Sequence, residues 1–154
     1  MTNLSLKIAN KDDRVSIVHL LTEMHKESGM GSLNINKVLN AIELCLSKGV
    51  ILSIEMDKEI VAVMGLRPST LWWTDNEMLM DQFTYVQPKA RKTKAIFKLV
   101  KEAKTIAKEM KMPMLLANFG FKNEERISKM YRRFGKPLGT TIITGDTSSF
   151  LWNK

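Results

Sequence analysis

The sequence of 154 residues lacks several features that would place it in a specialised class of protein. It has one cysteine and so cannot form an internal disulfide, which makes a reducing compartment the expected setting. It contains no apolar run near the 18 or so residues that a membrane-spanning helix needs, and its N-terminus lacks a secretory-signal pattern. We therefore expect a cytoplasmic protein that does not contact a membrane.

Acidic residues are also scarce, because 16 Asp and Glu stand against 24 Lys and Arg, for a formal net charge of +8. The imbalance is concentrated in residues 89–111, which hold nine basic and two acidic residues. A basic segment of this kind suits nucleic acid, a membrane surface or a phosphorylated small molecule. Composition alone does not choose among these partners.

The remaining composition is that of a globular domain, with 44% hydrophobic and 26% charged residues. No repeat or linker divides the chain, so we expect residues 1–154 to form one domain. Periodicity predicts a strand at 4–9, helices at 12–28 and 35–48, strands at 50–56, 60–66 and 78–86, a helix at 93–110, a strand at 112–119, a helix at 123–134 and a strand at 139–145. This βααβββαβαβ order predicts the α/β class, as one mixed sheet with helices on both faces.

The predicted helix at 93–110 begins with cations. Arg91, Lys92 and Lys94 stand near its N-terminus, where each opposes the helix macrodipole by roughly 0.3–1 kcal/mol. A bound anion would reverse this penalty, because a helix N-terminus favours phosphate. The segment is therefore a candidate phosphate site.

Further lysines continue along the same helix as far as Lys108. At about 1.5 Å per residue, Lys108 lies about 20 Å from Lys94, which is farther than one phosphate contact extends. We interpret Lys101, Lys104 and Lys108 as a solvated face, because lysines without interleaved exposed aromatics or arginines read bases poorly. Nucleic-acid binding is the alternative interpretation.

Residues 86–100, VQPKARKTKAIFKLV, contain Val86, Pro88 and Arg91, followed by the apolar pair Leu99–Val100. This arrangement resembles the strand–loop–helix motif of the GNAT superfamily of acetyltransferases. The family motif reads Val-x-Pro-x-x-Arg, with a Leu pair eight residues later.

A second motif points the same way. Tyr131 stands four residues before Gly135, like the Tyr-x-x-x-Gly helix end of the GNAT superfamily. The resemblance covers residues 4–145 and implies the GNAT fold. It also implies transfer of an acetyl group from acetyl-CoA directly to a primary amine, without a covalent acyl-enzyme.

The sequence departs from the family in its phosphate loop. Where the family has Arg/Gln-x-x-Gly-x-Gly/Ala, this chain has Arg91, Lys94 and Ile96, so both small residues are missing. Glycine allows backbone amides to approach a phosphate closely, and additional cations can compensate for its loss. In this respect the chain resembles divergent members associated with bacteriophages, which would place it in a host cytoplasm.

The resemblance implies a set of residues that bind coenzyme A. They are Thr84, Tyr85, Val86, Arg91, Lys92, Thr93, Lys94, Ala95, Ile96 and Asn118. It gives Tyr131 the role of the acid that protonates the departing thiolate. It also gives a backbone amide of Thr84 or Tyr85 the role of polarising the thioester carbonyl.

The general base is sought among the acids of the strand at 78–86 and the loop before it. Strict alternation places Asp81, Phe83 and Tyr85 on one face of that strand. Asp81 and Glu77 are the candidates, acting through water, and Asp75 is third.

Trp72 and Trp73 precede the same strand and are interpreted as a wall of the acceptor pocket, as a self-association patch for a homodimer, or as core residues. Cys45 is interpreted as a core residue, since no histidine partner for a thiolate is evident. His19 and His25 have no companion ligands, so we expect no metal.

Two functions thus follow from the sequence. The first is an acetyl-CoA-dependent N-acetyltransferase acting on a small-molecule or protein amine. The second keeps the GNAT-like fold but uses the basic helix to bind nucleic acid or an acidic protein, with weak or no catalysis; the missing glycines favour it, while Tyr131 and the Arg91 motif favour the first.

Overall fold

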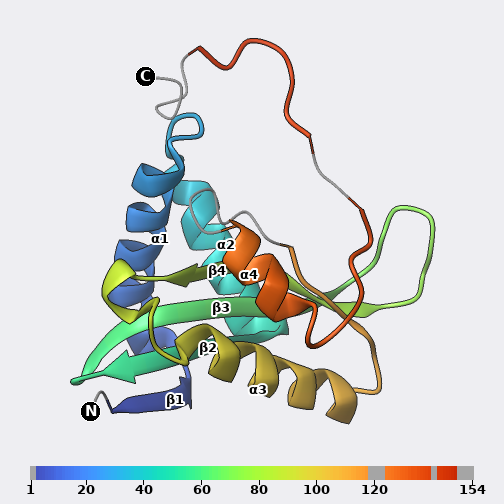
Figure 1. The fold of residues 1–154 in the computed structure, drawn as a ribbon, viewed down its shortest axis with the longest axis horizontal. Helices are drawn as coiled ribbons and strands as arrows, with labels where there is room; N and C mark the ends of the chain where they lie inside the picture. The colour runs from blue at the N-terminus through green and yellow to red at the C-terminus, as the bar shows by residue number, and fades with distance from the viewer. Residues whose placement is uncertain (1–2, 118–123, 140–141, 149–154) are drawn as a thin grey trace.

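The computed structural model describes residues 3–117, 124–139 and 142–148. Its five strands form one sheet in the order β1-β2-β3-β4-β5, with β5 parallel to β4 and the other neighbours antiparallel (Figure 1). The strands are β1 (Leu4–Ile8), β2 (Val50–Met56), β3 (Glu59–Ser69), β4 (Met78–Val86) and β5 (Met114–Leu115). The predicted class, a mixed sheet with helices on both faces, is confirmed.

Helices α1 (Arg14–Ser28) and α2 (Ile35–Lys48) cover one face of the sheet. The short 3₁₀ helix η1 (Lys11–Asp13) leads into α1. The core on this face is a cluster of Ala9, Ile17, Leu20, Leu21, Ile42, Cys45, Ile51, Val63, Phe83 and Tyr85. Burial raises the pKa of the Cys45 thiol to about 11, so this residue is a protonated core side chain, as the sequence predicts.

Helix α3 (Ala95–Glu109) packs on the opposite face. Its buried residues Leu99, Val100 and Ala103 contact apolar side chains of β2, β3 and β4. Helix α4 (Glu124–Tyr131) lies on the same side, where Met130 and Tyr131 pack against this second core. The sheet therefore separates two apolar layers.

The β2–β3 hairpin turns at Asp57 and Lys58, whose φ angles of 53° and 70° fit a two-residue turn that matches strand twist. Strand β3 is longer than predicted and continues through Pro68 to Ser69. Pro68 is tolerated because β2 pairs with β3 only as far as Leu66, so no neighbouring strand needs the missing N–H.

A β-bulge interrupts the pairing of β3 with β4. Gly65 lies opposite Phe83, whereas Leu66 lies opposite Asp81, so Gln82 is the additional residue. Gly65 is required here, because a Cβ at this position would lie 2.3 Å from Phe83 Cζ. The bulge reverses the alternation of side chains between residues 81 and 83.

Other element boundaries also differ from the prediction. Of the predicted strand at 112–119, only Met114–Leu115 form β5, and the described residues 112–113 and 116–117 lie outside it. Beyond β5, the Ala117 N–H donates to Asp81 Oδ1 at 3.0 Å. The predicted strand at 139–145 is wrong over residues 142–145, which lie outside any strand. Helix α4 ends at Tyr131, and its last turn tightens through the bond from Phe134 N to Tyr131 O (2.9 Å). Within the described part of the chain, no helix is long and apolar enough to cross a membrane.

Candidate active site

Asp81 and Thr84 meet on the α3 and α4 side of the sheet. Thr84 Oγ1 donates to Asp81 Oδ2 at 3.1 Å, while Phe83 and Tyr85 face the core beneath α1 and α2. The predicted sharing of one face by Asp81, Phe83 and Tyr85 is therefore wrong, because the bulge at Gln82 shifts the alternation by one residue.

Tyr131 completes a hydrogen-bonded chain with these two residues. Its hydroxyl is hydrogen-bonded to the side chain of Thr84, and the charge of Asp81 acts on it. Burial and the Asp81 charge raise the pKa of the phenol, and the contact with Thr84 lowers it by a smaller amount. Thr84 thus lies between Tyr131 and Asp81 and interacts with both.

Burial changes the proton affinity at both ends of this chain. It is the main cause that raises the pKa of the Asp81 carboxyl, against hydrogen bonds from Ala117 N–H and Thr84 that lower it. Burial also raises the pKa of the Tyr131 hydroxyl, and the negative charge of Asp81 raises it further. Tyr131 is therefore a protonated phenol at neutral pH, beside a carboxylate with increased basicity.

One edge of β4 lies alongside this chain. Gln87 N donates to Val61 O of β3 at 2.9 Å, so by alternation Tyr85 also directs its backbone groups toward β3. Thr84 and Val86 direct theirs to the other side, where the described part of β5 pairs only with Leu79 and Met80. Of the two amides predicted for the thioester carbonyl, that of Thr84 has the suitable direction.

Arg91, which the family resemblance predicts to bind phosphate, is held by groups of the protein itself. Its Nε donates to Val86 O at 3.0 Å, and its Nη2 donates to Glu27 Oε2 of α1 at 2.6 Å. The guanidinium also lies over the Tyr85 ring, 5.7 Å from the centroid. Arg91 thus connects the loop after β4 to the end of α1.

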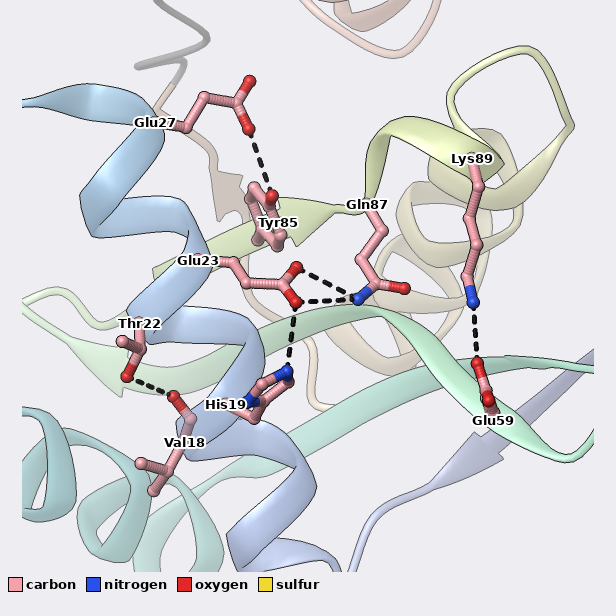
Figure 2. Close-up of polar contacts among 9 residues, drawn as sticks. All are labelled: Val18, His19, Thr22, Glu23, Glu27, Glu59, Tyr85, Gln87 and Lys89. Carbon is pink, nitrogen blue, oxygen red and sulfur yellow. Dashed lines mark hydrogen bonds and ion pairs between the residues drawn. The ribbon is translucent and has the colours of Figure 1, made fainter.

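Figure 2 shows the row of α1 acids that faces this loop. Glu27 Oε2 accepts from Tyr85 Oη at 3.0 Å, and Glu23 accepts from Gln87 Nε2 at 3.0 and 3.3 Å and lies 3.1 Å from His19 Nε2. Burial, with the Glu27 hydrogen bond, raises the pKa of Tyr85 to about 12. These contacts fix the loop from its α1 side.

The other predicted phosphate ligands surround the start of α3. Lys92 and Lys94 are exposed, and Thr93 Oγ1 accepts the Ala95 N–H at 3.1 Å. Helix α3 begins at Ala95 rather than at residue 93, with Lys94 as its N-cap. The side chain of Ala95 is buried and that of Ile96 packs against the core, so these two residues offer an anion only their backbone.

Four of the other predicted residues are exposed to solvent. Glu77 and Asp75 are exposed in the loop that precedes β4. Trp72 and Trp73 are 91% and 63% exposed, and within the described chain their ring contact is with each other, at 5.3 Å between centroids. Asn118 lies outside the described residues. The interpretation of Trp72 and Trp73 as core residues is therefore wrong, whereas the other roles predicted for these five residues stay predictions.

Sequence reasoning missed two participants. Glu27 was not considered because an acid near the C-terminal end of an amphipathic helix has the appearance of a solvated residue. The side chain of Thr84 was missed because strict alternation placed it on the face opposite Asp81. A glycine within the β3 pattern, Gly65, was the available signal for a bulge.

No protein-family model matches the sequence, and no curated protein sequence matches it. Solved structures do resemble the fold. A predicted acetyltransferase of Clostridium acetobutylicum with acetyl-CoA has a TM-score of 0.73 at 14% identity, covering 97% of this chain and 99% of its own. The aminoglycoside 6'-N-acetyltransferase AAC(6')-IG of Acinetobacter haemolyticus has a TM-score of 0.65 at 16% identity, covering 93% and 97%.

AAC(6')-Iy, in complex with a bisubstrate analogue of coenzyme A and acetylneamine, has a TM-score of 0.70 at 11% identity, covering 94% of this chain and 98% of its own. These three similarities extend over almost the whole length of each chain. The protein therefore has the fold of the GNAT acetyltransferases.

Proposed function

We propose that this chain is an N-acetyltransferase that transfers an acetyl group from acetyl-CoA directly to a primary amine. The proposal rests on one observation, the hydrogen-bonded chain from Tyr131 through Thr84 to Asp81 beside the edge of β4. The fold is compatible with it, since a similar structure contains acetyl-CoA. The identity of the amine acceptor stays open.

Acyl transfer to an amine needs a base near the acceptor and an acid near the leaving group. Asp81 Oδ2 has the increased basicity that suits it to take the acceptor proton, directly or through water. Protonation of Asp81 removes the negative charge that raises the pKa of Tyr131, so the phenol becomes a stronger acid at the stage when the thiolate needs a proton.

Thr84 couples the two events. Its hydroxyl can receive a proton from Asp81 while it releases its own toward Tyr131, so a proton taken from the amine replaces the one that Tyr131 gives to the leaving sulfur. The net result is an amide, a thiol and an unchanged protein. Acetyl-CoA supplies the activated acetyl thioester for this transfer.

The chain offers suitable groups to hold coenzyme A. The Thr84 and Val86 amides direct hydrogen-bond donors toward the open edge of β4. Lys92 and Lys94 supply exposed cations at the N-terminus of α3, a site that favours phosphate. Arg91 already donates to Val86 O and Glu27, so we assign it a structural role in the loop between β4 and α3.

A two-part experiment tests the proposal. Acetyl-CoA at about 100 times its dissociation constant should stabilise the fold by roughly 2.7 kcal/mol, measured as a rise in Tm. The double variant Lys92→Gln/Lys94→Gln should shift this effect to higher acetyl-CoA concentrations. Its matched control, Lys37→Gln/Lys48→Gln on exposed residues of α2, should not. An unchanged Tm at millimolar acetyl-CoA would refute the proposal.

Turnover is then measured with labelled acetyl-CoA and a panel of primary amines. Tyr131→Phe should lower kcat by about 100-fold or more, because general acid catalysis typically contributes 10²–10⁴-fold. The affinity for acetyl-CoA should stay unchanged, since the ring is retained. Wild-type turnover in this variant would remove Tyr131 from the mechanism.

A further inference from the structure

The exposed face of α3 carries a row of lysines. Leu99 and Ala103 face the sheet, whereas Lys101, Lys104 and Lys108 are exposed on the opposite side of the helix. Their spacing of three and four residues places them along one line. Within residues 3–117, 124–139 and 142–148, none of the three forms an ion pair.

The residues that follow α4 lie beside this row of lysines. The Phe134 ring lies 5.5 Å from the Phe97 ring and 5.9 Å from Lys104 Nζ, which brings the end of α4 against α3. Two exposed arginines immediately precede Phe134 and so lie close to the row. We define the basic surface as Lys101, Lys104, Lys108, Arg132 and Arg133.

An exposed aromatic pair projects from the end of the molecule toward which α3 runs. After α3 the chain enters β5, where Met114 lies beside Leu79 near the beginning of β4. The loop that carries Trp72 and Trp73 joins β3 to β4 at this same end, as Figure 1 shows for the β3–β4 loop and the C-terminal end of α3. Both tryptophans are solvent-exposed and their rings meet edge to face.

We propose that the basic surface and the Trp72–Trp73 pair together bind single-stranded nucleic acid. The cations would contact successive phosphates, and the tryptophans would stack on unpaired bases. Arginines and exposed aromatics are what the lysine row lacks in the linear sequence. The fold brings Arg132 and Arg133 beside the row through Phe134, and it places the β3–β4 loop with the two tryptophans at the end of the molecule toward which α3 runs. This binding activity is separate from the proposed acetyl transfer and does not depend on it.

Charge and exposure favour this partner over other polyanions. A membrane-surface helix needs a free apolar face, but the apolar face of α3 is buried in the core. A duplex would satisfy the cations and leave the tryptophans without a function, because its bases are already stacked. An unpaired strand uses both features.

The test is fluorescence anisotropy with a labelled single strand of about 20 nucleotides, longer than the roughly 4–16 that one single-strand-binding module occupies. Lys101→Gln/Lys104→Gln/Lys108→Gln should weaken binding and reduce the slope of log K against log salt by about 2, or about 0.7 per lost single-strand contact. Trp72→Ala/Trp73→Ala should weaken binding at least about fivefold with little change in that slope.

The matched control is Lys11→Gln/Lys37→Gln/Lys48→Gln, which removes the same charge from exposed residues on the α1 and α2 side. It should retain wild-type binding. Three results would overturn the proposal. The first is no binding of the single strand at about 50 mM salt, and the second is an equal loss of affinity in the control and in the α3 variant. The third is tighter binding to duplex or to anionic vesicles than to the single strand, with no effect of the tryptophan change on affinity. All measurements are made without acetyl-CoA, and a melting curve for each variant verifies that it is folded.

Discussion

At the scale of single residues, the environment of Asp81 makes its ionised form costly. Burial raises its pKa, while the Ala117 N–H at 3.0 Å and the Thr84 hydroxyl at 3.1 Å partly offset that cost. Retaining a buried carboxylate against this cost is typical of a residue that exchanges protons during a reaction. Arg91 and Glu27 differ from it, since their opposite charges lie 2.6 Å apart.

The raised pKa of Asp81 leads to a prediction about stability. Below the unfolded-state pKa of about 3.9 the carboxyl is neutral in both states and costs nothing. As pH rises, the unfolded chain loses this proton first, so the wild type loses stability until the pH passes the folded-state pKa. Asp81→Asn has no such loss. The Tm of the variant minus that of the wild type should therefore become more positive as pH rises from about 4 to 8.

The control for this measurement is Asp75→Asn, which changes an exposed carboxylate of the loop before β4. Its Tm difference from the wild type should be nearly independent of pH, because this side chain is exposed to solvent in the folded protein as it is in the unfolded chain. A flat profile for Asp81→Asn as well would show that burial does not shift its titration.

At the scale of elements, the bulge in β4 determines which side chains form the candidate site. By inserting Gln82 it places Asp81 beside Thr84, and the Asp81 carboxylate then accepts the Ala117 N–H where a backbone carbonyl would continue the pairing with β5. One additional residue therefore determines which groups the Asp81 carboxylate contacts.

Gly65 is the residue that permits this arrangement. A Cβ there would lie 2.3 to 2.7 Å from three atoms of the Phe83 ring, so Gly65→Ala should force the ring out of its position. Overpacking of this kind costs about 1–3 kcal/mol, which at about 2–4 °C per kcal/mol lowers Tm by about 2–12 °C. A decrease in kcat at a temperature where the variant is still fully folded would indicate that the bulge has also moved Asp81.

Gly135→Ala is the matched control. A Cβ at Gly135 would have no atom within 4 Å, so its Tm should change little. Equal destabilisation by the two substitutions would contradict the steric explanation for Gly65.

Periodic elements could be predicted from the sequence because their signal is local. The apolar spacing of α1, α2 and α3 and the turn at Asp57–Lys58 were recognisable in this way. The bulge could not, since it depends on how β4 aligns with β3. Residues 142–145 show the same limit, because β-branched composition gives strand propensity but cannot supply a neighbouring strand.

The candidate site was predicted only in part, because some of its contacts join residues that are far apart in the sequence. Tyr131 was identified from the family resemblance and Asp81 as an acid of the strand at 78–86, and the structure brings them together through Thr84. The engagement of Arg91 by Glu27 joins residues 64 positions apart, a contact that no local pattern records. Resemblance to a family supplies the expected role of a residue, whereas its actual partners depend on the tertiary fold.

At the scale of the whole molecule, one sheet serves two apolar layers. Neighbouring residues of β2 face opposite sides, so Ile51 belongs to the core beneath α1 and α2, while Leu52 belongs to the core beneath α3. A strand cannot lose its packing on one face and keep its geometry on the other. The two layers should therefore behave as one cooperative unit, as expected for a single domain.

This coupling gives a prediction for two substitutions on opposite faces. Ile42→Ala should leave a cavity in the core beneath α2, and Leu99→Ala should leave one in the core beneath α3, because both side chains are fully buried. Each should cost about 2–5 kcal/mol and lower Tm by about 4–20 °C, since a chain of this size loses about 2–4 °C per kcal/mol. Val15→Ala, at an exposed position of α1, is the control and should change Tm little.

The informative quantity is the number of thermal unfolding transitions. If the sheet couples both layers, each variant should keep one transition by far-UV circular dichroism, with equal calorimetric and van't Hoff enthalpies. A separate early transition in Leu99→Ala alone would mean that α3 unfolds independently of α1 and α2. The layer that carries the phosphate loop would then be a separate unit, and ligand binding to the loop would stabilise only that unit.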